Sequence, residues 1–296
     1  MADAKQGAQG KLCMEPGSSS HTFDTSSEPY QFLNENIQMI QSFADGNGIL
    51  GTRSHRKESV RIVRQECGGA ISMQPNPQEL NLLLPRILGA AESSDSFLLA
   101  ETLPAFGVLV DRNQQQFQYT DCKINRATFS GRSGELLDLT LDIWAKSEVV
   151  GTTYPSLTFG TTDVTPYTMS EGLLTIIGSA RGFHDFEVVI DNHLERRYVN
   201  SLTATSLTPT DRTVTLRCTV PFDADDLVHK TTPGAQGGTL VFQTGNISTT
   251  FTFANLTNSY RSPVITGKTE INSVHEYTAF KSGSTEPLVV THDSTS

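Results

Sequence analysis

A regular alternation of apolar and polar side chains over residues 136–144 constrains the fold of this chain more than any other feature. Leu137, Leu139, Leu141 and Ile143 occupy every second position, and acidic or hydroxyl side chains stand between them. Successive side chains of a β-strand point to opposite faces, so this pattern predicts a strand with one apolar and one acidic face. We expect it to lie half-buried in a sheet whose other face meets water.

Further runs of the same period predict a mainly β protein. They cover residues 108–110, 117–119 and 123–129, and glycine-rich or asparagine-rich segments separate them. Such runs, bounded by turn residues, are typical of strands in a β-sandwich or barrel.

One α-helix is predicted over residues 77–88. Asn76 can cap it, a proline takes the first helical position, and Glu79 can close a capping box. Leucine and isoleucine follow at helical spacing, which predicts packing against a sheet. Gly89 is suited to end the helix. Pro85 removes one backbone hydrogen bond, so we expect it to kink or shorten the last turn.

The order of strand, proline and capped helix occurs twice. The first copy begins at residues 69–76 and the second at residues 214–223, and similar strand-like runs follow each of them. Internal repetition of this kind predicts two tandem β domains with one helix each, at residues 30–150 and 180–282. Chance similarity between two β-rich halves is the alternative.

Polar segments lie outside the two predicted domains. Residues 1–29 are predicted to form an N-terminal arm, residues 151–179 a linker and residues 283–296 a C-terminal arm. Residues 287–290 within the last segment have the character of a short strand. Such arms can reach a neighbouring subunit, and ordinary fraying is the alternative.

Charge and cysteine usage narrow the functional classes. The formal net charge of −10 argues against a protein that grips nucleic acid through its phosphates. Four scattered cysteines, with no secretion signal recognisable, indicate reduced thiols. No apolar stretch approaches the ~18 residues of a membrane span, so we expect no membrane contact.

The sequence offers no recognisable reaction centre. It contains no nucleotide-binding glycine motif and no nucleophile elbow, and its seven histidines do not cluster. Asp223, Asp225 and Asp226 lack the glycine and glutamate of a calcium loop, and the dipole of a helix start explains them. We therefore expect no catalytic, cofactor-binding or metal-binding residue and no enzymatic activity.

One basic cluster stands out in this acidic chain. It lies in a glycine-containing segment and consists of Arg53, Arg56, Lys57, Arg61 and Arg64. We expect it to contact acidic surface on another copy of the chain. A solvated loop is the alternative.

Several segments together resemble phage tail tube proteins. They are residues 51–54, 68–80, 83–89, 186–192, 198–201, 208–212 and 261–267. The similarity covers most of residues 30–290, and no single motif is diagnostic. The resemblance implies two packed β-sheets flanked by a helix, and subunits that close into rings which stack into a hollow tube.

The resemblance is to the tail tube protein of a long-tailed siphophage. Within that family, the predicted duplication favours a trimeric ring with pseudo-sixfold symmetry, although a hexamer of chains is possible. The expected partners are further copies of the chain, the tape measure protein, and the tail terminator and distal tail proteins. DNA would pass through the lumen without specific binding. The protein would belong to the virion tail and assemble in the cytoplasm of the bacterial host.

The resemblance also suggests roles for charged residues. An acidic lumen would repel DNA phosphates, and the strands over residues 136–144 and 185–195 could supply it. The candidate lumen-facing residues are Asp138, Asp142, Asp185, Glu187 and Asp191. The loop over residues 45–61 is the first candidate to bridge successive rings. The alternative functions are a phage decoration or receptor-binding β-sandwich module that does not polymerise, and a hydrolase whose site cannot be recognised.

Overall fold

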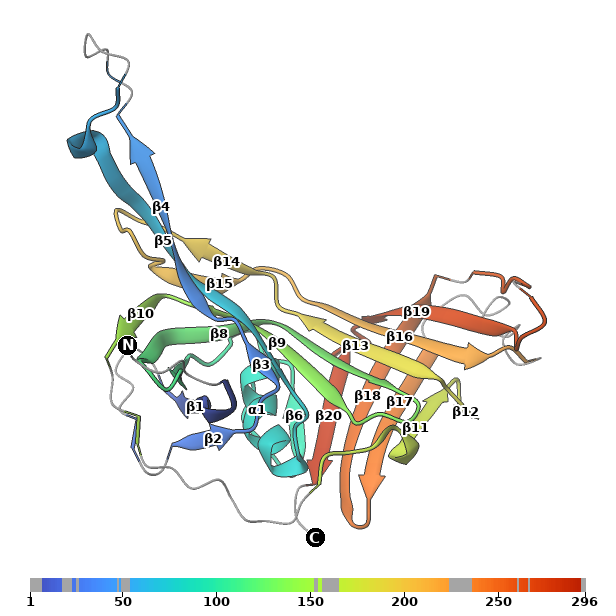
Figure 1. Cartoon of the computed structure of the whole chain (residues 1–296). Coiled ribbons are helices and arrows are strands. Elements are labelled where there is room, and N and C mark those ends of the chain that lie inside the picture. The colour runs from blue at the N-terminus through green and yellow to red at the C-terminus, as the bar shows by residue number, and fades with distance from the viewer. Residues whose placement is uncertain are drawn as a thin grey trace.

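The computed structural model describes residues 7–17, 23–24, 27–46, 48, 54–151, 154–155, 165–223, 236–259, 261–265 and 267–293. The fold is mainly β, as predicted, and its sheets are antiparallel. Figure 1 shows strands wrapping around one α-helix and a long hairpin that projects away from the body of the molecule.

The strands fall into two sets along the chain. The first set is β1 (Lys11–Pro16), β2 (Glu28–Tyr30), β3 (Asn34–Glu35), β4 (Gln38–Asp45), β5 (Val60–Met73), β6 (Ser96–Leu98), β7 (Phe106–Asp111), β8 (Gln116–Arg132), β9 (Asp138–Ala145) and β10 (Ser147–Val150). The second set is β11 (Gly172–Ile176), β12 (Ser179–Arg181), β13 (Asp185–Asp191), β14 (Leu194–Arg197), β15 (Ser206–Pro209), β16 (Thr213–Pro221), β17 (Gln236–Thr244), β18 (Ile247–Asn258), β19 (Asn272–Phe280) and β20 (Leu288–Asp293). The helix is α1 (Pro77–Leu88), and the short 3-10 turns are η1 (Gly7–Gln9), η2 (Lys57–Ser59) and η3 (Met169–Glu171).

Eight elements form one continuous antiparallel sheet through the middle of the molecule. Their order is β4, β5, β9, β8, β13, β16, β19 and β18. β8 is long enough to pair with β7 over its first part and with β13 over its last part. The two halves of the chain therefore share this sheet, and in Figure 1 it runs diagonally from β4 to β16 and β19.

The same pairings recur in the two halves. In the first, β2 pairs with β1, and β1, β7, β8, β9 and β5 follow one another, with β10 also on β8. In the second, β12 pairs with β11, and β11, β17, β18, β19 and β16 follow in the same order, with β20 also on β18. The hairpin β14–β15 occupies the chain position that the projecting hairpin β4–β5 occupies in the first half.

The predicted helix is present with the predicted caps. The Asn76 side chain accepts the backbone N–H of Glu79 at 2.9 Å, and the Glu79 carboxylate accepts the N–H of Asn76 at 3.0 Å. Gly89 ends the helix with a φ of 100°, which favours glycine. Of the two effects expected of Pro85, a kink or a shortened last turn, the shortening does not occur, because the helix continues to Leu88. Its leucine face is fully buried against the sheets.

One hydrophobic core extends through both halves. Phe129 of β8 meets Phe251 of β18 edge-to-face, with ring centroids 5.0 Å apart. His292 of β20 is buried as well, and its Nε2 donates a hydrogen bond to the Pro77 carbonyl at 2.7 Å. The C-terminal strand therefore anchors the start of α1 across 215 positions of the sequence.

Three of the polar segments contribute to the sheets. Residues 11–16 of the expected N-terminal arm form β1, where Leu12, Cys13 and Met14 are fully buried, so this part is core and no free arm. The expected linker contains β11, which pairs with β17. The short strand expected at residues 287–290 is confirmed as β20. The second predicted helix and Asp225 and Asp226 lie outside the described residues, and the domain boundaries remain a prediction.

Candidate functional site

A polar face of the continuous sheet gathers all five carboxylates that the sequence singled out. Directly opposite residues of antiparallel strands project to the same side. Asp142 of β9 stands opposite Arg126, which stands opposite Asp191. Asp138 of β9 and Glu187 of β13 stand opposite the same residue of β8, and Asp185 of β13 stands opposite Arg132 of β8. These three carboxylates therefore lie on the same face. The opposite faces of these strands are buried, as the alternation predicted.

The acidic character of this face outweighs its basic character. Four successive rows of opposite residues lie on β9, β8, β13, β16 and β19, and two of these rows cross all five strands. The carboxylates in these rows are Asp138, Asp142, Asp185, Glu187, Asp191 and Glu276, and the guanidinium groups are Arg126, Arg132 and Arg217. Six negative and three positive groups leave a net charge of −3 on the rows.

Each of these arginines has a carboxylate beside it. The Arg126 Nε donates to Asp191 at 2.7 Å, and the Arg217 Nε lies 3.9 Å from a Glu276 oxygen. Arg132 stands opposite Asp185. A guanidinium next to a carboxylate presents little net positive field to an approaching anion. These four rows are therefore acidic or neutral.

Hydroxyl groups occupy the row between the charged rows. Thr140, Thr128, Thr215 and Thr278 stand across the sheet in register, with Val189 in the middle position. Threonine hydroxyls offer weak, neutral hydrogen bonds, whereas lysine or arginine would hold a phosphate. The sequence alternation predicted polar side chains here but could not show that they align.

A second candidate surface lies on the projecting hairpin β4–β5. Arg56, Lys57 and Arg61 are exposed near its tip, whereas Arg53 lies outside the described residues. Arg64 is exposed as well and already has partners within the chain. It pairs with Glu66 at 2.7 Å and stacks over the ring of Tyr198, which joins the two hairpins.

The hairpin β4–β5 also exposes apolar side chains, which were not predicted from the sequence. Ile40, Phe43, Val60 and Val63 are exposed to 55%, 61%, 45% and 49%. Phe43 stands opposite Ile62, so their side chains share one face. Apolar side chains clustered on a projecting hairpin are typical of a surface that another protein covers. The run of apolar residues on both sides of the basic cluster was the available signal.

The comparison with known families decides between the functional classes. The family model of the phage tail tube protein matches residues 37–279. This chain belongs to the phage tail tube protein family. It is thus a structural component of the phage tail, as the sequence resemblance predicted. No curated protein matches the sequence of this chain significantly.

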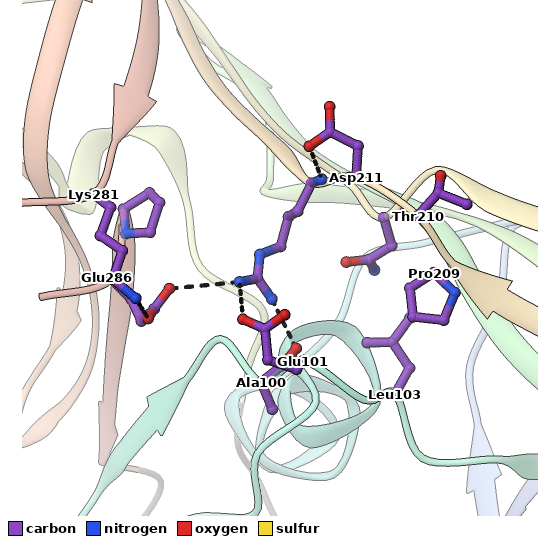
Figure 2. Close-up of a pocket in the computed structure, with 11 residues that line it drawn as sticks. Ala100, Glu101, Leu103, Pro209, Thr210, Asp211, Lys281 and Glu286 are labelled. Carbon is purple, nitrogen blue, oxygen red and sulfur yellow. Dashed lines mark hydrogen bonds and ion pairs between the residues drawn. The ribbon is translucent and has the colours of Figure 1, made fainter. Parts of the chain in front are cut away.

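A polar cavity of this tail tube protein lies where loops of both halves meet. Glu101, Lys281 and Glu286 line this cavity of about 270 Å³ (Figure 2). An Arg212 guanidinium nitrogen lies 3.5 Å from a Glu286 oxygen and 3.8 Å from a Glu101 oxygen. Arg212 donates to the Ala100 carbonyl at 2.7 Å, and Lys281 binds Glu286 at 2.6 Å. Because both cations already have partners, we interpret the cavity as a polar junction that joins the loops.

The described part of the tail tube protein contains no group of three or more histidine, cysteine, aspartate or glutamate side chains placed to hold a metal ion. Among the described residues, no helix has the length and apolarity needed to cross a bilayer.

Proposed function

We propose that this tail tube protein self-assembles into stacked rings that form the tube of a long-tailed siphophage, and that genomic DNA passes through the lumen. The acidic face shared by β9, β8 and β13 is the observation that carries this proposal. A surface of this kind, lining a channel, keeps a polyanion mobile because each arginine of its four rows stands beside a carboxylate.

The ring is proposed to contain three chains with pseudo-sixfold symmetry. The repeated order of strand pairings supports a duplicated tube domain within one chain, so three chains would supply six units. A ring of six chains is the alternative. Closing the sheet around the lumen removes its exposed edges, which otherwise favour aggregation.

The lumen lining is proposed to include Asp138, Asp142, Asp185, Glu187 and Asp191. Their role is electrostatic, and we propose no enzymatic activity, cofactor or metal for this protein. The neighbouring threonine row would give DNA a neutral surface to slide along, since hydroxyls exchange their hydrogen bonds with water at little cost.

The hairpin β4–β5 is proposed to bridge successive rings. Its exposed apolar side chains and its basic tip suit a contact that buries apolar surface and pairs with acidic groups of the next ring. We expect neutralisation of Arg53, Arg56, Lys57 and Arg61 to glutamine to weaken polymerisation and leave the melting temperature unchanged. Normal tubes from this variant would contradict the assignment.

The remaining partners follow from the position of a tube in a tail. We propose that the assembled tube encloses the tape measure protein and meets the tail terminator and distal tail proteins at its ends. Assembly is proposed to take place in the cytoplasm of the bacterial host, and no membrane contact is proposed.

Negative-stain electron microscopy of the purified chain at high concentration tests the function. We expect rings or tubes with a central channel. Discrete particles that do not polymerise at any concentration would contradict the proposal and favour a decoration or receptor-binding module.

A further inference from the structure

The projecting hairpin β4–β5 leaves the body of the molecule as a two-stranded ribbon. β5 pairs with β9 only from Cys67 to Met73, so among the described strands its residues 60–66 have β4 alone as a partner. A two-stranded hairpin is marginally stable in water by itself. The direction of the ribbon therefore depends on what its base contacts.

The hairpin β14–β15 of the second half lies beside that base (Figure 1). It is fixed to the body through β8, where the Lys123 Nζ donates to the carbonyl of the buried Leu207 at 2.9 Å. Its loop reaches β5, where the Gln65 N–H donates to the Leu202 carbonyl at 2.7 Å. β14–β15 thus connects the body with a part of β5 that β9 does not support.

Five side chains of alternating character join the two hairpins. The Arg64 guanidinium lies 4.2 Å from the ring centroid of Tyr198, and the Arg196 guanidinium lies 3.9 Å from that of Trp144. Between the two cations, the Glu66 carboxylate lies 2.7 Å from Arg64 and 3.9 Å from Arg196. A network of this kind holds side chains more firmly than one exposed ion pair, because several contacts must break together.

Arg196 is the centre of this contact. Its Nη2 donates to the carbonyl of Cys67, the residue at which the pairing of β5 with β9 stops, at 2.9 Å. The neighbouring Gly68 leaves room for the guanidinium, since a Cβ there would lie 2.8 Å from this nitrogen. Stacking on a ring while donating in the plane is a geometry that arginine provides and lysine does not.

A β-bulge lies directly beyond the supported residues. The register of β4 and β5 shifts between Ser42, which stands opposite Arg64, and Phe43, which stands opposite Ile62. A bulge bends a strand and increases its twist. The contacts with β14–β15 therefore end where the ribbon bends, and the apolar residues and the basic tip lie beyond this point.

We propose that β14–β15 supports β4–β5 and fixes its direction, with Arg196 and Tyr198 as the positioning residues. The inference rests on the proposed bridging of successive rings by β4–β5 and names the device that presents this hairpin to the next ring. A contact surface already held in its bound orientation loses less conformational freedom on binding, so it binds more tightly. The second half of the chain thus contributes its own hairpin to hold that of the first half.

Distances between two spin labels, measured by pulsed electron paramagnetic resonance, report the direction of the hairpin. The labels are attached at Glu58→Cys near the tip and Val149→Cys on β10, both exposed, in the dilute chain before assembly. The native thiols do not compete, because all four are buried and burial raises the pKa of both Cys13 and Cys67 to about 12. Thiolate is the reactive form.

The test variant combines Arg196→Ala with Tyr198→Ala. Its matched control combines Glu195→Ala with Arg197→Ala, two exposed side chains on the opposite face of the same strand. We expect the distance distribution to widen about twofold in the test variant and to stay unchanged in the control. Without labels, the protein concentration needed for tube growth should rise about tenfold in the test variant alone.

Single substitutions separate positioning from folding. Tyr198→Phe keeps the ring over Arg64 and should behave as the wild type in both measurements. Tyr198→Ala should widen the distribution at an unchanged melting temperature, and it decides the question if the double variant does not fold.

An unchanged distance distribution in the folded test variant would overturn the proposal. A wider distribution with normal tube growth would overturn it as well, because the direction of the hairpin would then not matter for the contact. If the wild type forms no tubes, the proposed function fails, whereas the label distances still decide whether β14–β15 holds the hairpin.

Discussion

Amide substitutions on the acidic face should convert a surface that does not bind DNA into one that does. The variant carries Asp138→Asn, Asp142→Asn, Asp185→Asn and Glu187→Gln, which changes the formal net charge from −10 to −6. The amides retain acceptor oxygens for the hydrogen bonds that Asp138 receives from Gln74 and Asp142 from Asn125. The fold should therefore be unaffected.

The magnitude follows from the arginines on the same face. The variant keeps Asp191 beside Arg126 and Glu276 beside Arg217, so only Arg132 loses its carboxylate and one phosphate contact becomes available. At about 0.9 per neutralised phosphate, the logarithm of the affinity should fall with the logarithm of salt with a slope of about −0.9. That slope corresponds to about a 3.5-fold loss between 50 and 200 mM salt.

Fluorescence anisotropy with a labelled DNA duplex measures this slope. A control variant with the same net charge carries Glu58→Gln, Glu92→Gln, Glu101→Gln and Asp211→Asn, all exposed and outside the four rows. We expect no binding by the wild type or the control. Binding by the control equal to that of the face variant would refute the reasoning, because net charge alone would then explain the effect.

Three further predictions concern the fold. Burial lowers the pKa of His292 below its ordinary 6.5, so the unfolded chain binds a proton that the folded chain does not, and stability should fall as pH drops below about 6.5. His292→Gln should make the melting temperature less dependent on pH in this range. An unchanged pH dependence in this variant would contradict the prediction. Arg86→Met should cost about 3 kcal/mol in urea unfolding, because it leaves the partly buried Glu28 carboxylate without its cation, and a loss below 1 kcal/mol would be inconsistent. Phe251→Ala should cost about 3–5 kcal/mol, whereas Phe280→Ala, at a side chain 50% exposed, should change stability by less than about 0.5 kcal/mol.

Local signals predicted the elements that depend on neighbouring residues. The capped helix at Asn76 and the alternating strand β9 were both predictable, because a few adjacent residues determine them. The two runs at residues 117–119 and 123–129 proved to be one strand, β8. Asp121 between them has a positive φ and interrupts the alternation, which concealed the continuity.

Contacts between distant segments were out of reach of the sequence pattern. The alternation indicated acidic faces on β9 and β13, but their common side depends on the register of β8 between them. The buried strand β1 was missed because its residues stand in a polar, glycine-containing segment and are buried only through pairing with β7. The exposed apolar surface of the hairpin β4–β5 could have been predicted, because apolar residues stand on both sides of the basic cluster in the sequence.

Native mass spectrometry of the assembled protein tests the central claim most directly. If identical copies complete the open strand edges of each chain, the assembled protein should consist of rings of three chains of 32.3 kDa each. Rings of six chains would correct the number of chains per ring, and identical copies would still complete the strand edges. A protein that remains a single chain at every concentration, with its strand edges protected from hydrogen exchange, would contradict it.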